Sequence, residues 1–439
     1  MTDVLDSLTT SPPNLAWRIR TVAAMRASMR EGAGHWGALD QVVSSATNFV
    51  PSVLVARAVD PRSFSGFAAV FSGCVFIIGL LRGSIGEPVL IRAERLRTGQ
   101  SRLGGSALAA ALAGGALLGT ACLGLSFELS SPLRAPLLAL GLTLPGVLLQ
   151  DTARYVLFAS LRHRAAFIND LLWLVLTCLG FAAWALAGQA LTGGSGLLIW
   201  GAAGWACALV AVAQARASVW TDPVRILREN GDLGRHLGFQ FLALAGAGQL
   251  AVYLLGGVSG LTSLGQVRSV QLLFGPMNVL FLSAYVTLVP RGLGHDTRRL
   301  RRDLNRATAL LTALAVVTTA VLLAVPSRLG TQVLGESWAG AHRLVLLYGI
   351  YMVTLTCATT PTVGLSVLEQ ARTMTYVRIA SVPVTIVLPV LAGARWGASG
   401  YVGGLVVVGA GVAAAWWAAF ERHLASSAPA VPASAQVLR

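Results

Sequence analysis

Several charged residues of this 439-residue chain interrupt long apolar stretches, and Asp151 and Arg154 form the closest such pair. They stand three positions apart, so in a helix both side chains would leave from the same face. A charge at the centre of a membrane helix costs about 2.5–3.5 kcal/mol on insertion scales, so it usually faces water or a partner. Two chemistries fit this spacing. The pair either neutralises itself within the helix, or Asp151 holds the Arg154 guanidinium towards a water-filled cavity, where it would bind an anion.

Four further charged residues lie in stretches of the same kind: Asp40, Arg82, Glu87 and Arg268. A guanidinium presents a planar fork of donors that matches the oxygens of a phosphate group. Arg82, Arg154 and Arg268 are therefore candidate anion ligands. For each of them the structural alternative is a pair with a neighbouring helix, or a side chain that extends its charged end to the membrane surface.

The elements that must position these residues are long and apolar. Hydrophobic residues make up 55% of the chain and charged residues only 12%, which is far more apolar than an ordinary soluble domain. Twelve segments approach the roughly 20 residues that a helix needs to cross a bilayer. They lie at 36–58, 64–81 (with a possible extension to 91), 105–125, 136–161, 165–188, 195–213, 237–258, 267–289, 307–325, 344–368, 376–394 and 401–420. The sequence predicts an all-α polytopic membrane protein.

The gaps between these segments alternate in charge. Arginines gather in every second gap, most densely at 291–306, whereas the intervening gaps hold few. Basic loops resist crossing the membrane, so the arginine-rich gaps and both termini are expected on the cytoplasmic side. The net charge of +15 lies in these short loops. We therefore expect it to meet anionic membrane lipids and not nucleic acid.

Several kinds of chemistry are excluded or disfavoured by composition. The chain contains no lysine, so it has neither a Walker phosphate loop nor a Schiff-base residue. Its five cysteines stand singly in apolar stretches, without the spacing of a metal site. No Asp-x-Asp occurs, and the longest gap on the outer side, 326–343, is too short for a catalytic domain. We expect no enzymatic activity, no cofactor and no bound metal.

The chain also repeats itself at about half its length. Gly34-His35-Trp36-Gly37 opens the first apolar segment, and Arg235-His236-Leu237-Gly238 opens the seventh. This repeat predicts two parallel six-helix lobes, at 36–215 and 237–421, related by an axis along the membrane normal. The remaining parts are a basic cytoplasmic linker at 216–236, a basic segment at 1–35 and a disordered cytoplasmic tail at 422–439. The segment at 1–35 is either an amphipathic helix at the headgroups or a disordered tail.

Two stretches resemble a known family. The run from Val53 to Phe67, with its Asp60-Pro61 turn, resembles the amino-terminal signature of the bacterial polysaccharide flippases. The run from Leu264 to Gln271, followed by Pro276-Met277-Asn278 and Leu288-Val289-Pro290-Arg291, resembles the eighth helix of the same family. That family belongs to the multidrug/oligosaccharidyl-lipid/polysaccharide exporter superfamily. The resemblance implies two six-helix bundles that form a V around a central cavity, in a bacterial cytoplasmic (inner) membrane.

The resemblance also implies a function and a set of roles. The cargo would be a polyprenyl-diphosphate-linked oligosaccharide, moved from the cytoplasmic to the outer leaflet by alternating access. The two extra carboxy-terminal helices of the peptidoglycan-precursor flippases are absent from this sequence, which favours a surface or capsular glycan. Polysaccharide polymerases or glycosyltransferases of the same pathway are the expected partners. The alternative is a cation-coupled MATE-type exporter of small amphipathic compounds.

Site residues follow from these roles. Arg82, Arg154 and Arg268 would bind the lipid diphosphate, and Arg154→Ala would impair transport without affecting membrane insertion. Asp40 and Glu87 are candidates for a proton or sodium site. Gln240 and Gln249 would line the same cavity, or make interhelical hydrogen bonds of the kind common in membrane bundles.

Overall fold

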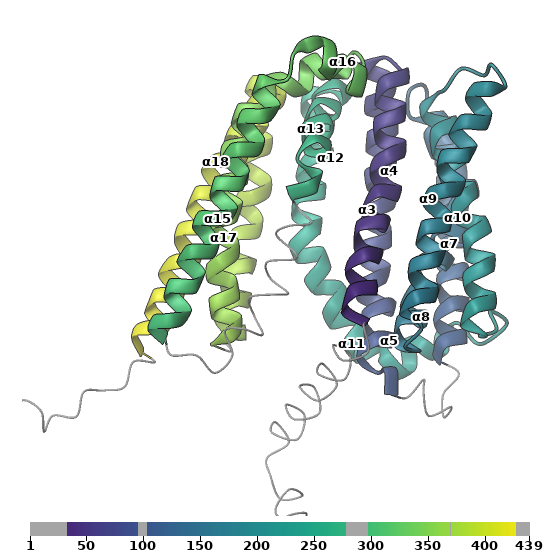
Figure 1. Ribbon diagram of the computed structural model, residues 1–439, viewed down its shortest axis with the longest axis horizontal. Helices are drawn as coiled ribbons and strands as arrows, with labels where there is room; N and C mark the ends of the chain where they lie inside the picture. Colours follow the sequence, from purple (N-terminus) through teal and green to yellow (C-terminus); the bar gives the residue numbers. More distant parts are fainter. Residues whose placement is uncertain (1–32, 95–102, 278–296, 369, 427–439) are drawn as a thin grey trace, which may run out of the picture.

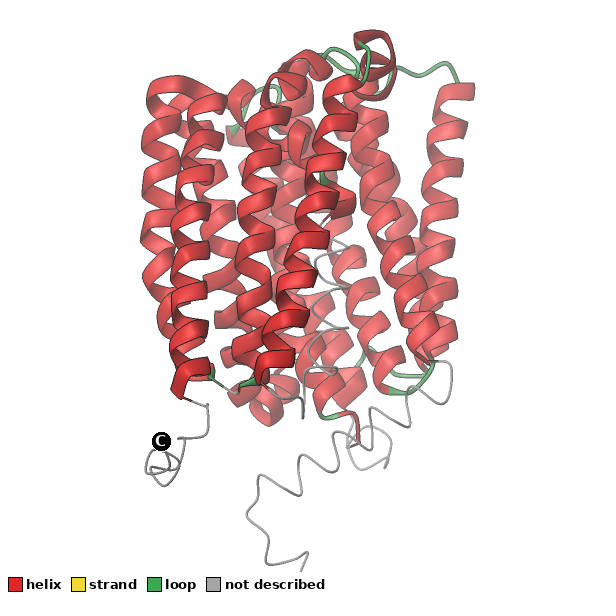
Figure 2. Cartoon of the chain, turned by 60° about the vertical axis from the view of Figure 1, so that its left-hand side comes forward, coloured by secondary structure: helices red, strands yellow, loops and turns green. Residues whose placement is uncertain are grey.

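The computed structural model describes residues 33–94, 103–277, 297–368 and 370–426, which form helices and short loops without any strand (Figure 2). In chain order the helices are α3 (Ala33–Ala58), α4 (Pro61–Leu81), the π-helix η1 (Arg82–Gly86), α5 (Glu87–Ile91), α7 (Leu103–Glu128), α8 (Arg134–Ala159), α9 (His163–Leu186), α10 (Gly193–Ala215), α11 (Val224–Phe241), the π-helix η2 (Leu242–Gly246), α12 (Ala247–Ser259), α13 (Leu261–Leu273), α15 (Thr297–Ala324), α16 (Ser327–Leu334), α17 (Ser337–Val367) and α18 (Ala371–Ser426). Within this described part, eight helices are long and apolar enough to cross a membrane. The predicted all-α, multi-pass membrane architecture is confirmed.

Some helix bounds differ from those expected. Helix α11 begins at Val224, so the greater part of the expected linker at 216–236 is helical. Helix α15 begins at Thr297, ten residues before the expected apolar segment, because a helix does not have to end where its apolar residues end. Helix α18 consists of two arms that meet at a break at Trp396 and Gly397, where Gly397 has a φ of +63°. The amino-terminal segment, the motif at 288–291 and most of the expected tail lie outside the described residues.

The helices form two groups (Figure 1). The N-lobe contains α3, α4, α5 and α7–α10, and the C-lobe contains α12, α13 and α15–α18. Helix α13 packs on α4 as well as on α17, so it lies between the lobes. The first and last described helices, α3 and α18, have their free ends on the same side of the molecule, opposite to α16 (Figure 1). We call this side, which carries the arginine-rich segments, the arginine-rich end.

Small residues allow close helix packing inside the N-lobe. A Cβ on Gly115 would lie 2.6 Å from the Cα of Pro145, and one on Gly119 would lie 2.6 Å from the Gly141 carbonyl oxygen. Helices α7 and α8 therefore touch almost backbone to backbone, as GxxxG contacts do in membranes. The position of α8 matters for function, because α8 carries Asp151 and Arg154.

The turn between α3 and α4 is set by local capping. The Asp60 side chain accepts hydrogen bonds from the backbone N–H groups of Arg62 (2.9 Å) and Ser63 (3.1 Å), and Pro61 occupies the first position of α4. Both features are typical of a helix start. Hydrogen bonding from the Ser63 side chain and backbone holds the pKa of Asp60 below its usual value.

The lobes meet at the α16 end, and at the arginine-rich end the helix α11 between the lobes packs on the N-lobe. At the α16 end, Gly335 has a φ of +56°, and a Cβ there would lie 2.8 Å from the Ala56 carbonyl oxygen of α3. At the arginine-rich end, α11 packs on η1 and α5, where Arg92 donates to Asp232 at 2.6 Å. A cavity lies between these two contacts.

Candidate functional site

A central cavity of about 750 Å³ is lined by α3, α4 and α13 together with Gly275 and Pro276. Helix α3 contributes Gln41, Ser45, Asn48 and Ser52. These residues are spaced by four, three and four positions, so they form one stripe along a helix face. The stripe brings to the cavity two amides that can donate and accept, and two hydroxyls that donate to backbone carbonyls of α3 and can still accept. Val42, Ala46 and Phe49 of the same helix line the cavity as well.

The wall formed by α4 is aromatic. Phe64, Phe67 and Phe71 line the cavity, and the rings of Phe67 and Phe71 are stacked with centroids 5.3 Å apart. Behind them Phe71 makes an edge contact with Trp200 of α10 at 5.1 Å. These three rings belong to the N-lobe core and are almost fully buried, so they form a fixed apolar boundary of the cavity and expose little ring surface to it.

Arg268 of α13 is the charged residue among those that line this cavity. Its Nη1 donates to Gln271 at 2.8 Å and its Nη2 to Gln249 at 2.7 Å. Gln249 in turn donates to the Ser72 hydroxyl of α4 at 3.3 Å. The Arg268 Nε is buried without a hydrogen-bond partner in the described part of the chain.

No carboxylate neutralises Arg268 within the described residues. The sequence explains why. Beyond residue 236 the acidic residues stand outside the apolar segments; they are Asp296, Asp303, Glu336, Glu369 and Glu421. A cation held only by neutral amides in a partly apolar cavity remains free to bind an anion.

The N-lobe holds a separate, buried cluster of five charged residues from α3, α8, α9 and η1, in which arginines and aspartates are paired. Arg82 binds Asp151 through Nε, at 3.0 Å from each carboxylate oxygen, and through Nη2 at 2.6 Å. Arg154 forms a short ion pair with Asp40 and lies 3.3 Å from Asp170. The Arg154–Asp151 distance is 3.8 Å, so the pair expected from the sequence is the longest of these contacts.

Neutral side chains complete the cluster. Gln150 donates to Asp170 at 2.8 Å and to Asn169 at 3.0 Å, and Asn169 donates to the Cys207 carbonyl at 2.9 Å. Asp40, Asp151 and Asp170 outnumber the guanidiniums of Arg82 and Arg154 by one. The Asp40 Oδ1 and Gln150 Oε1 atoms are buried without a hydrogen-bond partner within the described part. The cluster therefore has one carboxyl group more than it has guanidiniums, and it has two unused acceptors.

The structure separates the residues that the sequence placed in one cavity. Of the expected residues, Arg268 lines the central cavity, and Gln249 accepts a hydrogen bond from Arg268. Arg82, Asp151 and Arg154 are absent from the cavity lining, because carboxylates on other helices hold both guanidiniums inside the N-lobe. Of the remaining candidates, Asp40 is buried in the N-lobe cluster. Gln240 is exposed and forms a hydrogen bond of 3.0 Å with His236. Glu87 is exposed in the first turn of α5.

Two groups of polar residues in these sites were not predicted from the sequence. Asp170 interrupts the apolar segment at 165–188, so the criterion that selected Asp40 and Asp151 would have selected it as well. The stripe of Gln41, Ser45, Asn48 and Ser52 could have been found from its helical spacing. Its residues are uncharged, and a search for intramembrane charges passes over them.

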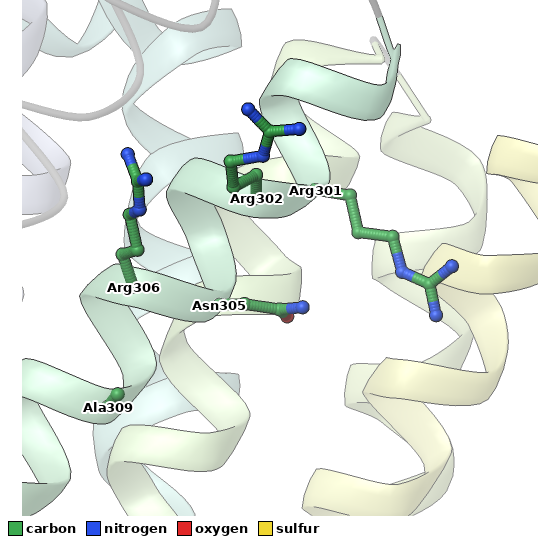
Figure 3. A pocket seen from close by; sticks show the side chains of 5 residues that line it. All are labelled: Arg301, Arg302, Asn305, Arg306 and Ala309. Carbon is green, nitrogen blue, oxygen red and sulfur yellow. The ribbon is translucent and has the colours of Figure 1, made fainter.

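A second depression lies at the start of α15, at the arginine-rich end (Figure 3). It has a volume of about 450 Å³ and is lined by Arg301, Arg302, Asn305, Arg306 and Ala309. Arg302 and Arg306 project from one side of α15, whereas Arg301 projects towards α18 (Figure 3), where it pairs with Glu421 at 3.0 Å. The depression therefore presents two exposed guanidiniums one helical turn apart.

No protein-family model matches the sequence, and no curated protein matches it. Solved structures do match the fold. An inward-facing MATE-family multidrug resistance transporter of the MOP superfamily superposes with a TM-score of 0.67 at 12% identity, over 88% of this chain and 96% of that chain. The lipid II flippase MurJ, in an inward closed conformation, gives 0.64 at 11% identity over 88% and 89%. An outward-facing MATE-family transporter gives 0.57 at 11% identity over 89% and 95%.

These likenesses show the fold. The chain has the two-bundle architecture of MATE transporters and of MurJ, as predicted. The agreement is closer with the inward-facing than with the outward-facing transporter.

Proposed function

We propose that this protein is a membrane flippase that moves a polyprenyl-diphosphate-linked oligosaccharide from the cytoplasmic to the outer leaflet by alternating access. The observation that carries the proposal is Arg268, a cation without a carboxylate partner among the described residues, in a cavity with a polar and an aromatic wall. Such a ligand combines a phosphate anion, many hydroxyl groups and apolar faces. The cavity offers a complement to each of them.

We propose a role for each wall of the cavity. Arg268 would exchange its bonds to Gln249 and Gln271 for the oxygens of a phosphate group, since charge-assisted hydrogen bonds are stronger than bonds to neutral amides. Gln41 and Asn48 would bind sugar hydroxyls, because an amide both donates and accepts. Phe64 and Phe67 would form the fixed apolar side of the cavity, because both rings are held in the N-lobe core. Transport of this kind needs no catalytic residue.

The N-lobe cluster would keep the N-lobe rigid while the lobes rock. Its ion pairs connect α3, α8, α9 and η1, so relative movement of these helices would break buried charge contacts. The lobe can then move as a unit around the cavity, as alternating access requires.

The depression on α15 would receive the headgroup first. Arg302 and Arg306 expose two guanidiniums at the arginine-rich end, which we take as the cytoplasmic side of a bacterial inner membrane, with both termini there. The closer fit to an inward-facing transporter supports access from that side. We expect the glycosyltransferases that build the glycan and a polymerase that consumes it to be the pathway partners.

A second candidate function rests on the extra carboxyl group of the N-lobe cluster. One carboxylate of Asp40, Asp151 and Asp170 has no matching guanidinium, so the cluster can hold one proton or a small cation. This observation favours a cation-coupled exporter of small amphipathic compounds. Both candidates use the same fold, and they differ in cargo and in the need for a coupling ion.

The test measures polyprenyl-diphosphate-linked oligosaccharide in cells with and without this gene, together with surface glycan. Accumulation of completed lipid-linked units with loss of surface glycan supports the flippase. An unchanged pool with normal surface glycan, in a strain without a second flippase, rejects it and favours the exporter. Higher dye retention in cells without the gene than in cells with it would then support the exporter.

A further inference from the structure

A pocket inside the C-lobe surrounds a second arginine. It has a volume of about 290 Å³, and Arg378 of α18 is the charged residue in its lining. Its walls come from η2, α12, α17 and both arms of α18. None of its lining residues lines the central cavity, and Tyr351 in its wall makes an edge contact with Tyr348, which packs on Phe274 of the region between the lobes. We call this space the C-lobe pocket.

Arg378 has no ion pair with any residue that the structure describes. The helices around it cannot provide one locally, because α12, α13, α17 and the first arm of α18 contain no acidic residue. The second arm contains Glu421, which pairs with Arg301 at 3.0 Å. Among the described residues, this half-buried guanidinium therefore has no anionic partner and can bind an anionic ligand.

Apart from the indole of Trp416, the polar side chains beside Arg378 carry hydroxyls. Ser381 and Thr385 follow it on the same face of α18, and Thr359 and Thr362 face the pocket from α17. Each of these hydroxyls donates its proton to a backbone carbonyl of its own helix, at 2.5–2.8 Å. Their oxygens remain available as acceptors. The pocket thus offers donors at Arg378 and acceptors around it.

This pattern fits a ligand that carries both an anionic phosphate and hydroxyl groups. The rest of the lining is apolar, with Ala247, Leu355, Val382 and Val412 among its residues. Its volume lies at the lower end of small-molecule sites, which span about 300–1,000 Å³, so a lipid-linked oligosaccharide would not fit. Arg378 stands seven residues after the start of α18, or about 10 Å along the helix. With the start of α18 at the headgroup level, this distance places Arg378 near the boundary between headgroups and hydrocarbon.

We propose that the C-lobe pocket binds the glycerophosphate headgroup of an anionic phospholipid with a free polyol, with its phosphate on the Arg378 guanidinium and its hydroxyls on Thr359, Thr362, Ser381 and Thr385. The bound lipid would give Arg378 the kind of anionic partner that Asp151 and Asp40 give to Arg82 and Arg154 in the N-lobe. This proposal stands independently of the transported cargo.

The experiment counts lipids retained by the purified full-length protein from vesicles of equal parts phosphatidylglycerol and phosphatidylcholine. We expect selective retention of phosphatidylglycerol, weakened about 10- to 100-fold in Arg378→Gln, because a charge-assisted contact to phosphate is lost. Arg372→Gln is the matched control, since Arg372 is exposed on the first turn of the same helix. It should retain phosphatidylglycerol as the unaltered protein does.

Two results would overturn the proposal: equal retention by Arg378→Gln and the unaltered protein, or an equal loss in Arg372→Gln, which would indicate surface charge alone. A separate arm adds free glycerol phosphate at increasing concentration. Saturable binding of the free ester without lipid retention would replace the phospholipid by a soluble phosphate ester. If Arg378→Gln does not fold, Arg378→Lys keeps the charge but loses the planar fork, and it should weaken retention several-fold. Retention equal to that of the unaltered protein in Arg378→Lys would also count against the proposal.

Discussion

The two lobes treat buried charge in opposite ways. In the N-lobe, Arg82 and Arg154 are shared among three carboxylates and lie inside the helix bundle. In the C-lobe, Arg268 and Arg378 have only neutral neighbours within the described part and line cavities. An arginine in an apolar segment can therefore play two different roles. Where carboxylates surround it, it holds helices together, and where none does, it is available to a ligand.

The largest effect that tests this comparison is expected for Arg154→Ala. The change leaves Asp40 and Asp170 buried without their cation, which should cost about 3–5 kcal/mol of stability. The sequence predicted impaired transport with normal membrane insertion for this variant. The structure predicts a loss of folded protein instead. The measurement is thermal unfolding and yield in detergent, with Arg134→Ala, at the exposed start of the same helix, as control.

A second variant connects that loss to charge. Asp40→Asn added to Arg154→Ala removes one of the stranded carboxylates and should restore part of the stability. Normal stability of the single variant would show that Arg154 is not a structural ion and would return it to the list of cargo ligands.

The opposite pattern is expected for Arg268→Gln. Binding of a polyprenyl-diphosphate-linked glycan should weaken about 10- to 100-fold, while the unfolding temperature stays the same or rises, because no carboxylate is stranded. Cargo binding and thermal unfolding are measured on the same preparation. A strongly destabilised Arg268→Gln protein with normal cargo binding would break the distinction between the lobes.

Asp170→Asn should have a smaller effect on stability than Arg154→Ala. It removes the carboxylate in excess, so Arg82 and Arg154 keep one partner each, and the expected cost is about 1 kcal/mol for a weakened hydrogen bond. If the cluster couples transport to protons, the same variant should also remove the dependence of transport on a pH gradient. Measurements in vesicles with and without the gradient decide between the flippase and the cation-coupled exporter. A loss of stability as large as that of Arg154→Ala would contradict the charge count.

The smallest effect is expected outside both lobe interiors, at the exposed cap residue Asp60. Asp60→Ala should cost about 1 kcal/mol, the usual value of a helix N-cap. Because the pKa of Asp60 is lowered in the folded protein, its stabilisation is present above the ordinary Asp pKa of about 3.9 and is lost as the pH falls through the folded value. Unfolding followed between pH 3 and pH 7 measures this. An unchanged pH profile in Asp60→Ala would show that the cap contributes nothing.

The architecture was readable from the sequence to a large extent. Apolar length predicted the membrane helices, and the half-chain repeat predicted two bundles, which agrees with the matching transporter folds. The ends of helices were less accessible. Helix α11 extends into a stretch with little apolar character, since its Gly234 and Gly238 pack closely on Ser84 of η1. A neighbour elsewhere in the chain stabilises that helix, and hydropathy along the chain does not record it.

The candidate site was only half predictable. Six of the intramembrane charges were recognised from local context, yet their division into a structural cluster and a cavity ligand was not. Asp151 and Arg154 adjoin on one helix, and spacing alone favours their pairing. In the folded chain, Arg82 forms an ion pair with Asp151, and Arg154 forms one with Asp40. Competition among partners on several helices decides this, and a local pattern contains no information about it.

The sequence by itself determined the bilayer as solvent, the all-α multi-pass architecture and the absence of acidic residues from the apolar segments beyond residue 236. These properties depend on local composition and on the cost of moving charge across a membrane, which sum along the chain. Only the tertiary structure decided which charges meet. Arg82 reaches a partner 69 positions away and Arg154 one 114 positions away, whereas Arg268 finds only glutamines. Coulomb attraction acts through space, so helix packing decides the partners. It pairs Arg154 with carboxylates of other helices and leaves Arg268 available to a ligand.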